Sequence, residues 1–259
     1  MKQLEAKIES NTECLPGIHL LRMNAPEIAA ESRPGQFVTI HCGPDTLLRR
    51  PLSIHRASGA SIELLFQVVG AGTQWLANQG EGGSLDMLGP LGNGFSIGSG
   101  ARQLLLVAGG IGIAPLVYLA EAAAARGLTV KLAVGVANRN CLFPITIEDC
   151  EVIPFTEDGS AGTAGLVLEA IPSFIDWADQ LFACGPISMY RKMASMADIL
   201  GNKPVQVVLE QVMGCGTGAC RGCSIPTKDG MKMVCADGAV FDLRDIEWEA
   251  VTAPGIVRF

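Results

Sequence analysis

The chain has 259 residues, 49% of them hydrophobic and 17% charged, with a formal net charge of −7. This length allows two or three modest domains, and an acidic balance without any basic run argues against nucleic-acid binding. No apolar run approaches the roughly 20 residues of a membrane span, and no secretory signal is visible, so we expect a soluble cytoplasmic protein.

The first segment, residues 1–98, has short apolar runs that alternate with turn residues. Period-two runs broken by Gly, Pro, Asn and Asp are typical of strands in an antiparallel sheet or barrel. The runs that carry this pattern are residues 17–23, 35–42, 49–57, 61–69 and 82–90. We therefore predict an antiparallel β-barrel domain over this segment.

Two stretches of the first segment are candidates for phosphate binding. Arg50-Pro51-Leu52-Ser53 lies on one predicted strand, and a second strand runs into Gly70-Ala71-Gly72-Thr73 and a short helix. A helix N-terminus behind a glycine turn offers free N–H groups to a pyrophosphate, and Arg50 could add a bidentate donor. Each signal alone is weak, because most glycine turns serve only as turns and an arginine on a strand usually faces solvent.

The second segment, residues 99–205, has the rhythm of an α/β domain. Its first predicted unit is a strand at 103–108, a helical run at 113–127 and a strand at 129–136. A second unit follows with a strand at 179–185, one helical run at 186–201 and a strand from 205. Continuous apolar strands that alternate with helices indicate βαβ units and a parallel sheet.

Two turns of the second segment lie where α/β sheets bind ligands. The first turn contributes three glycines ahead of a helix: Gly109, Gly110 and Gly112. Pro115 stands where the dinucleotide fingerprint has its third glycine, so this turn does not match that fingerprint. Cys184-Gly185-Pro186 follows at the carboxyl end of a predicted parallel strand. Without another motif, Cys184 is as readily a buried apolar thiol as a functional one.

The third segment, residues 206–259, carries a cysteine cluster on a glycine-rich loop. Four cysteines are spaced with four, two and eleven residues between them: Cys215, Cys220, Cys223 and Cys235. The first three match the plant-type ferredoxin spacing for a 2Fe-2S cluster, and the glycines let the backbone wrap around a cluster and point N–H groups at its sulfurs. A zinc site and unmetallated thiols stay open as alternatives, although structural zinc favours two pairs of closely spaced ligands.

The cysteine count bears on the redox state of the chain. Nine cysteines are an odd number, which argues for reduced thiols and against a disulfide framework. The short gap before Cys235 indicates an appended module and not a free-standing ferredoxin domain. Cys14, Cys42, Cys141 and Cys150 have no partner spacing, and we interpret them as small core or surface residues.

Together, these motifs resemble the ferredoxin–NADP reductase superfamily. The stretch at 50–53, the turn at 70–73, the sequence GGIGIAP and the sequence CGP follow one another in the order of that superfamily, over roughly residues 5–200. The added sequences MGCGTGACRGC and VCADGAVFDLRDIEW make the chain similar to the electron-transfer subunits of type B dihydroorotate dehydrogenases.

This resemblance implies three cofactors and their residues. FAD would lie on the barrel at Arg50, Pro51, Leu52, Ser53, Gly70, Gly72 and Thr73. NAD(H) would lie over Gly109, Gly110 and Gly112, with its ring beside the catalytic Cys184 and next to Gly185 and Pro186. A 2Fe-2S cluster would be bound by Cys215, Cys220, Cys223 and Cys235. Leu52 replaces the aromatic residue or Ile that the family often has, and His55 is expected near the flavin ring.

The resemblance also implies a partner. Electrons would pass between NAD(H) and the catalytic flavoprotein subunit of dihydroorotate dehydrogenase, in a heterotetramer that serves pyrimidine biosynthesis. The chain has no motif for binding dihydroorotate itself, so the second subunit would be required. Val212 and Met213 would form part of the docking surface beside the cluster.

Other functions stay open on the sequence. A related subunit could serve a sulfite reductase, a hydrogenase or an NAD(P)H-dependent bifurcating complex, and a non-catalytic regulator could keep a vestigial nicotinamide site. Arg139 stands without a basic cluster for a 2′-phosphate, while Glu157 and Asp158 favour a free ribose diol. NAD is therefore expected in preference to NADP.

Overall fold

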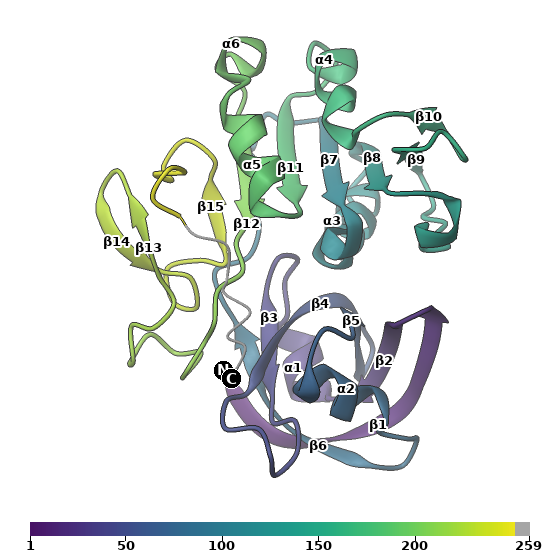
Figure 1. Ribbon diagram of the computed structural model, residues 1–259, viewed down its shortest axis with the longest axis vertical. Helices are drawn as coiled ribbons and strands as arrows, with labels where there is room; N and C mark the ends of the chain where they lie inside the picture. Colours follow the sequence, from purple (N-terminus) through teal and green to yellow (C-terminus); the bar gives the residue numbers. More distant parts are fainter. Residues whose placement is uncertain (252–259) are drawn as a thin grey trace.

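The computed structural model describes residues 1–251, which form a barrel, an α/β sheet and a small C-terminal region (Figure 1). The barrel is closed and antiparallel, with the strand order β1-β2-β5-β4-β3-β6. Its strands are β1 (Lys2–Leu15), β2 (Ile18–Asn24), β3 (Phe37–Ile40), β4 (Arg50–Ser58), β5 (Ser61–Gln67) and β6 (Ser84–Leu91). Helices α1 (Pro26–Glu31) and α2 (Ala71–Ala77) accompany it. The predicted antiparallel barrel is confirmed.

The barrel has a hydrophobic core of its own. Successive side chains of a strand face opposite sides, and the inward residues Leu21, Met23 and Leu64 are fully buried. The outward residues Arg22 and Glu63 are opposite one another on β2 and β5, where they form an ion pair. The period-two pattern of the sequence is this alternation between core and solvent.

The second sheet has seven strands in the order β10-β9-β8-β7-β11-β12-β15. They are β7 (Gln103–Gly109), β8 (Thr129–Val136), β9 (Cys150–Thr156), β10 (Thr163–Ala164), β11 (Gln180–Cys184), β12 (Val205–Val208) and β15 (Val240–Asp242). All neighbours are parallel except β12 and β15. Residues 104–108 of β7 are completely buried, as expected for a strand covered on both faces. The predicted parallel α/β domain is confirmed.

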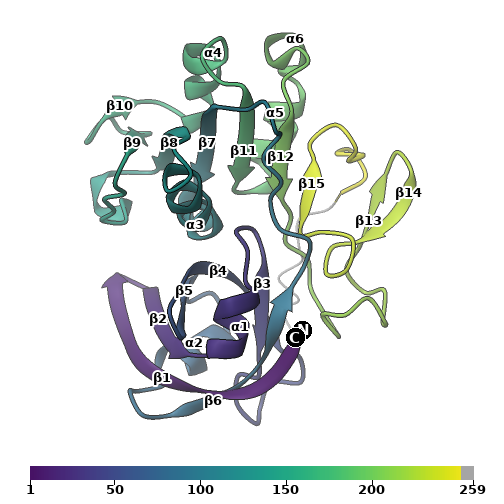
Figure 2. The ribbon, with the colours of Figure 1, turned by 180° about the vertical axis from the view of Figure 1, so that it is seen from behind.

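Helices cover both faces of this sheet. Helix α3 (Ile113–Ala124) lies on one face, and α4 (Ala170–Phe174), α5 (Ile187–Ala194) and α6 (Ala197–Leu200) lie toward the other (Figures 1 and 2). The single helical run predicted at 186–201 is wrong, because the helix ends at Ala194 and restarts at Ala197. Met193 before the break and Leu200 after it are each at most 2% exposed, so both helices pack against the core.

The C-terminal segment joins the α/β sheet. Strand β15 hydrogen-bonds to β12. The predicted boundary between residues 205 and 206 falls inside β12. A hairpin of β13 (Ser224–Thr227) and β14 (Gly230–Met233) lies beside this edge (Figure 1). The predicted module runs to residue 259, and residues 252–259 of it lie outside the described part of the chain. The division at residues 98 and 205 stays a prediction.

Within residues 1–251, no helix combines the length and the apolar character that crossing a bilayer would require.

Candidate functional site

A cleft of about 940 Å³ lies where the α/β sheet meets the barrel. The sheet contributes the carboxyl ends of β7, β8 and β11, through Gly109, Val136 and Cys184. The barrel contributes one end of β2 and of β5, through Ile18 and Gln67. Ligands of open α/β sheets bind beyond the carboxyl ends of the strands, in cavities of about this size. The cleft is therefore the candidate binding site.

The cleft brings together the residues predicted to bind the nicotinamide. Six of them line it: Gly109, Gly110, Gly112, Cys184, Gly185 and Pro186. They come from the turns after β7 and β11, which are neighbours in the sheet with Ala108 opposite Cys184. Because parallel strands end at the same edge, residues far apart in the sequence meet here.

The glycines of these turns are required by how closely the turns approach each other. A Cβ on Gly112 would lie 2.0 Å from the carbonyl oxygen of Cys184, and a Cβ on Gly109 would lie 2.9 Å from Cδ of Pro186. Gly110 differs, because its φ is +55° and nothing lies within 4 Å of its Cβ position. Two of the three glycines thus serve packing, and Gly110 leaves its side open to the cleft.

Cys184 is a thiol in the wall of the cleft, with 4% of its surface exposed. Burial, and secondarily the nearby Glu210, raises the pKa of Cys184, so the thiol stays protonated at neutral pH. The hydroxyl of Tyr190 accepts the N–H of Gly185 at 2.9 Å and donates to the carbonyl of Val208 at 2.5 Å. This buried tyrosine ties the cysteine turn to the end of β12.

Sequence reasoning missed several residues that line the cleft, among them Gln67, Lys192 and Glu210. The Glu210 side chain is open to water in the cleft, while the surrounding walls still desolvate the carboxyl enough to raise its pKa. An acidic residue directly after the apolar run 205–209 was the available signal for Glu210. Nothing in the sequence distinguishes Lys192 from an ordinary solvated lysine on a helix.

The predicted flavin residues form a second group, outside the lining of the cleft. Arg50 begins β4, and its side chain reaches α2, where Nε lies 2.6 Å from the position that a Cβ on Gly72 would take. Oγ1 of Thr73 accepts the N–H groups of Val69 and Gly70, at 2.9 and 3.2 Å. The two predicted stretches therefore meet at one guanidinium, and Gly72 leaves the room for it.

The remaining residues of the first stretch follow β4 along the barrel wall. Pro51, Leu52 and Ser53 pair with β3 and are partly exposed. His55, expected near the flavin ring, does not line the cleft and is completely buried. Desolvation lowers the pKa of His55 to about 4, so the imidazole is neutral. Ile54 beside it belongs to the barrel core, so His55 faces out of the barrel, where its Nδ1 lies 2.9 Å from the carbonyl oxygen of Ala114 in α3.

The four predicted cluster cysteines lie on the loop between β12 and β13 and just after β14. The Sγ atoms of Cys223 and Cys235 are 3.3 Å apart. Every sulfur accepts at least one backbone N–H: Cys215 from Thr217 and Cys220 at 3.4 Å each, Cys220 from Gly222 at 3.4 Å, Cys223 from Cys235 at 3.4 Å, and Cys235 from Gly218 at 3.1 Å. Such amide donors stabilise the negative charge of thiolate ligands.

The thiols differ in their acidity. Hydrogen bonds from the backbone of Cys220 and Thr217 lower the pKa of Cys215 to about 6. Burial raises the pKa of Cys235 to about 12, and the neighbouring Cys223 adds to this effect. Within residues 1–251, no three His, Cys, Asp or Glu side chains lie close enough together to hold a metal ion as they stand, and this includes the four cysteines.

One barrel residue lies against the cluster loop. Oγ1 of Thr39 is buried and has no hydrogen-bond partner among the described residues. It lies 3.8 Å from the position of a Cβ on Gly216, whose φ is +74°. A buried hydroxyl without a partner costs free energy unless a bound group accepts its hydrogen bond. The surroundings of the loop therefore fit a group that carries acceptor atoms, as the sulfides of an iron–sulfur cluster do.

The three residues considered for the choice between NAD and NADP lie in different places relative to the cleft. Glu157 lines the cleft, whereas Asp158 and Arg139 do not. The backbone N–H of Arg139 donates to Oγ of Ser160 at 2.8 Å. This bond joins the loop of Arg139 to the loop that follows Asp158. The cleft therefore carries a carboxylate and no arginine at this edge.

The C-terminal region matches a known family model. Residues 210–247 match the model described as the iron–sulfur cluster binding domain of dihydroorotate dehydrogenase B. This range contains all four cysteines of the loop and begins at Glu210.

Curated relatives match over nearly the whole chain. The dihydroorotate dehydrogenase B (NAD(+)) electron transfer subunit of Desulforamulus reducens is 36% identical over 96% of this chain and 99% of its own. The protein of the same name from Caldanaerobacter subterraneus subsp. tengcongensis is 35% identical over 92% of this chain and 96% of its own. A solved structure of the NADH-dependent reduced ferredoxin-NADP oxidoreductase, from work on flavin-based electron bifurcation, is 28% identical with a TM-score of 0.85, over 94% of this chain and 90% of its own.

Proposed function

Because the chain belongs to the family of dihydroorotate dehydrogenase B electron transfer subunits, we propose that it carries electrons between a catalytic flavoprotein subunit and NAD(H). Members of this family are oxidoreductase subunits of the NAD-dependent enzyme of pyrimidine biosynthesis. FAD, when bound, exchanges two electrons with the nicotinamide and single electrons with a 2Fe-2S cluster. The observation that carries the proposal is the cleft between the barrel and the sheet, where the turns after β7 and β11 meet.

The cleft supports the nicotinamide part of the proposal. Gly110 leaves backbone open to a ligand, and Cys184 presents a protonated thiol beside it. We assign Cys184 the role of orienting the nicotinamide ring and excluding water from it. A buried neutral thiol suits this role because it is uncharged and needs no counter-ion. Glu157 at the edge of the cleft favours a ribose diol, and with it NAD.

The strand that begins at Arg50 supports the flavin part. The guanidinium lies beside Gly72 at the start of α2, so a pyrophosphate bound there would receive both a fixed charge and backbone N–H groups. Thr73 stabilises the turn by accepting two amides. We assign Pro51, Leu52, Ser53, Gly70 and Gly185 to the surface that positions the flavin and the nicotinamide.

The amide donors on all four sulfurs support the cluster part. Four thiolates suit an iron–sulfur cluster or zinc, and the loop spacing together with the unpartnered Thr39 hydroxyl favours 2Fe-2S. Cys220 is exposed, so the cluster end of the loop faces solvent where a partner can approach. Val212 is 45% exposed and suits a docking surface, whereas Met213 is 5% exposed and anchors the loop from inside.

A catalytic flavoprotein subunit is the partner that we propose for this surface, in a heterotetramer. The test begins with anaerobic purification, which should give about two irons and two acid-labile sulfides per chain. The chain alone should oxidise NADH with artificial acceptors and should leave dihydroorotate untouched. Mixed with a type B catalytic subunit, it should form a stable complex that reduces NAD+ with dihydroorotate.

A variant separates the parts of this test. Cys220→Ser should abolish the cluster spectrum and the transfer to the partner, yet leave reduction of the flavin by NADH largely intact, because the cleft lies elsewhere. Stoichiometric zinc without iron would overturn the cluster, and unaided turnover of dihydroorotate would overturn the division between subunits. Copurification with a sulfite reductase or hydrogenase subunit would replace the partner.

A further inference from the structure

Helix α3 turns one polar edge toward the barrel. Ala114, Tyr118 and Glu121 follow the i, i+4, i+7 spacing that places residues on one helix face. Each of them forms a hydrogen bond or an ion pair with a barrel residue. Because α3 begins directly after the glycine turn 110–112 of the cleft, this face controls where that turn lies.

The first contact joins the start of α3 to β4. Nδ1 of His55 lies 2.9 Å from the carbonyl oxygen of Ala114, and Nε2 lies 3.4 Å from Nη1 of Arg56. An arginine nitrogen only donates, so Nε2 is the acceptor and Nδ1 carries the proton that goes to Ala114. The ring is completely buried and packs edge-on against Phe143, at 5.9 Å between centroids. Phe143 lines the cleft, so His55 stands directly behind the cleft wall.

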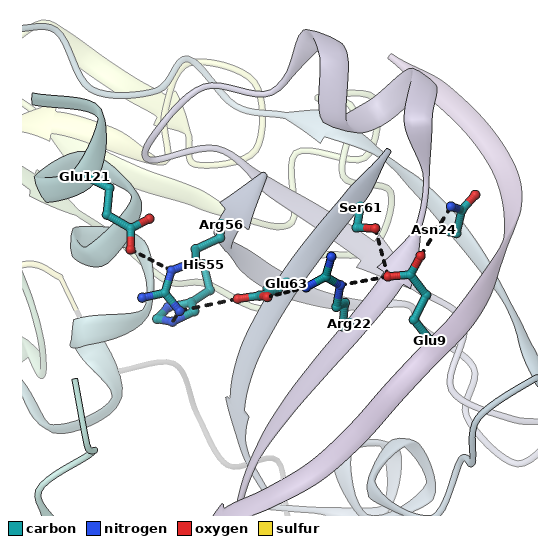
Figure 3. Close-up of polar contacts among 8 residues, drawn as sticks. All are labelled: Glu9, Arg22, Asn24, His55, Arg56, Ser61, Glu63 and Glu121. Atoms are coloured by element: carbon teal, nitrogen blue, oxygen red, sulfur yellow. Dashed lines mark hydrogen bonds and ion pairs between the residues drawn. The ribbon is translucent and has the colours of Figure 1, made fainter. Parts of the chain in front are cut away.

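The second contact is an ion pair across the same junction. Nε of Arg56 lies 2.7 Å from Oε1 of Glu121, two helical turns beyond Ala114. The same guanidinium meets Glu63 of β5 at 3.4 Å, on the outer face of the barrel. Figure 3 shows this row of polar contacts, which continues through Arg22 on β2 to Glu9 on β1. Of the two carboxylates that Arg56 contacts, only Glu121 lies across the junction on α3.

The third contact lies between the other two. The hydroxyl of Tyr118 donates to the carbonyl oxygen of Ser32 at 3.1 Å, at the end of α1. Its ring packs against the barrel core. Three contacts spread along one helix face resist both sliding and rotation of α3, which a single contact could not do.

We infer that His55, Arg56 and Tyr118 are positioning residues that fix α3, and the glycine turn before it, against the strand that carries the predicted flavin residues. We name these three residues the α3 clamp. The inference rests on the proposed function for its consequence, because β4 holds Arg50 and Ser53 at one end and the clamp at the other. Hydride transfer needs reacting atoms about 3–3.5 Å apart, so a loosened turn slows transfer more than it weakens binding.

The decisive variant is Glu121→Gln, which breaks the ion pair on a partly exposed side chain and leaves the core intact. We expect the single-turnover rate of flavin reduction by NADH to fall roughly two- to fivefold, with the dissociation constant of NADH unchanged. Amide hydrogen exchange in α3 of the cofactor-free chain should accelerate by a similar factor. Tyr118→Phe should act in the same direction.

The matched control is Glu63→Gln, which removes a carboxylate from the same guanidinium on the barrel side only. It should change neither the transfer rate nor the exchange of α3. If Glu63→Gln slowed transfer as much as Glu121→Gln does, the effect would come from charge in general and the clamp would be overturned. Unchanged amide exchange of α3 in both Glu121→Gln and Tyr118→Phe would also overturn the clamp.

His55 is tested by two substitutions. His55→Phe keeps a ring but removes the donor, and we expect roughly a five- to tenfold slower transfer. His55→Asn keeps a donor near the Nδ1 position and should recover part of the rate, which a purely space-filling role would not allow. If the parent chain fails to oxidise NADH, the proposed function fails, while the exchange measurements still decide whether the clamp exists.

Discussion

The glycine turn at 109–112 packs against the end of β11 at Cys184, and the glycine-rich loop at 214–222 carries Cys215 and Cys220. The glycines of the two regions serve different physical needs. In the turn, Gly112 is required because a Cβ would collide with the backbone of a neighbouring strand end. In the loop, Gly216 and Gly218 have φ of +74° and +85°, and the N–H of Gly218 is donated to a sulfur. One region is shaped by packing, and the other by backbone conformation that exposes amides.

The cysteines of the two regions differ in the same way. Cys184 ends a buried strand, and burial raises its pKa. Cys215 lies on a loop without regular structure, and amide donors lower its pKa to about 6. A thiol that only positions a ligand benefits from the first environment, and a thiolate that binds metal benefits from the second.

The largest expected effect is on the packed turn. Gly112→Ala should lower the free energy of unfolding by about 3 kcal/mol or more, because backbone atoms cannot yield to the added methyl group. Gly110→Ala is the control, with open space and only a positive φ, and should cost about 1–2 kcal/mol. Denaturant unfolding of the cofactor-free proteins measures both, and equal losses would show that packing does not set the turn apart.

Gly72 lies beside the flexible side chain of Arg50, so its substitution should affect FAD retention more than folding stability. Gly72→Ala would push the Arg50 side chain aside, and Arg50→Ala would remove it, so both should weaken FAD retention about ten- to hundredfold. Folding should change little, because the displaced atoms end a flexible chain. Equilibrium dialysis reports the flavin bound, and retention like that of the parent would place Arg50 outside the flavin site.

A smaller effect is expected in the cluster loop. Gly218→Ala imposes a side chain at φ +85°, which should cost about 1–2 kcal/mol, and it crowds Ala236 at 3.0 Å. We expect a less stable cluster, seen as faster loss of visible absorbance in air, with flavin reduction by NADH unchanged. Slower flavin reduction in this variant would link the loop to the cleft and weaken the comparison.

The smallest perturbation is a change of pH alone. In the cluster-free chain, Cys215 should be alkylated by iodoacetamide with a midpoint near pH 6, slowly below it as the thiol and fast above it as the thiolate. Cys184 should stay unmodified over the same range, because it is buried and protonated. Peptide mass spectrometry distinguishes the two, and a Cys215 midpoint near 8.5, the ordinary value, would contradict the role of the amides.

Much of the fold follows from local patterns. Period-two runs predicted five of the six barrel strands, all except β1, and the continuous apolar runs predicted β7, β8 and β11, since burial on one face or two leaves a direct trace in composition. The helical run at 186–201 was predicted without the interruption that separates α5 from α6 in the structure. Strands β10 and β15 at the two edges of the sheet, and β9 next to β10, were not predicted.

The sequence by itself determined which residues are available for chemistry: the cysteine spacing, the glycine turns and Arg50 are read from neighbours in the chain. Only the tertiary structure decided that Gly112 faces the carbonyl of Cys184, that Glu210 lines the cleft and that His55 bonds to α3. The physical reason is that these contacts join strands and helices far apart in the chain. Their distances depend on how the barrel and the sheet pack, which no local pattern encodes.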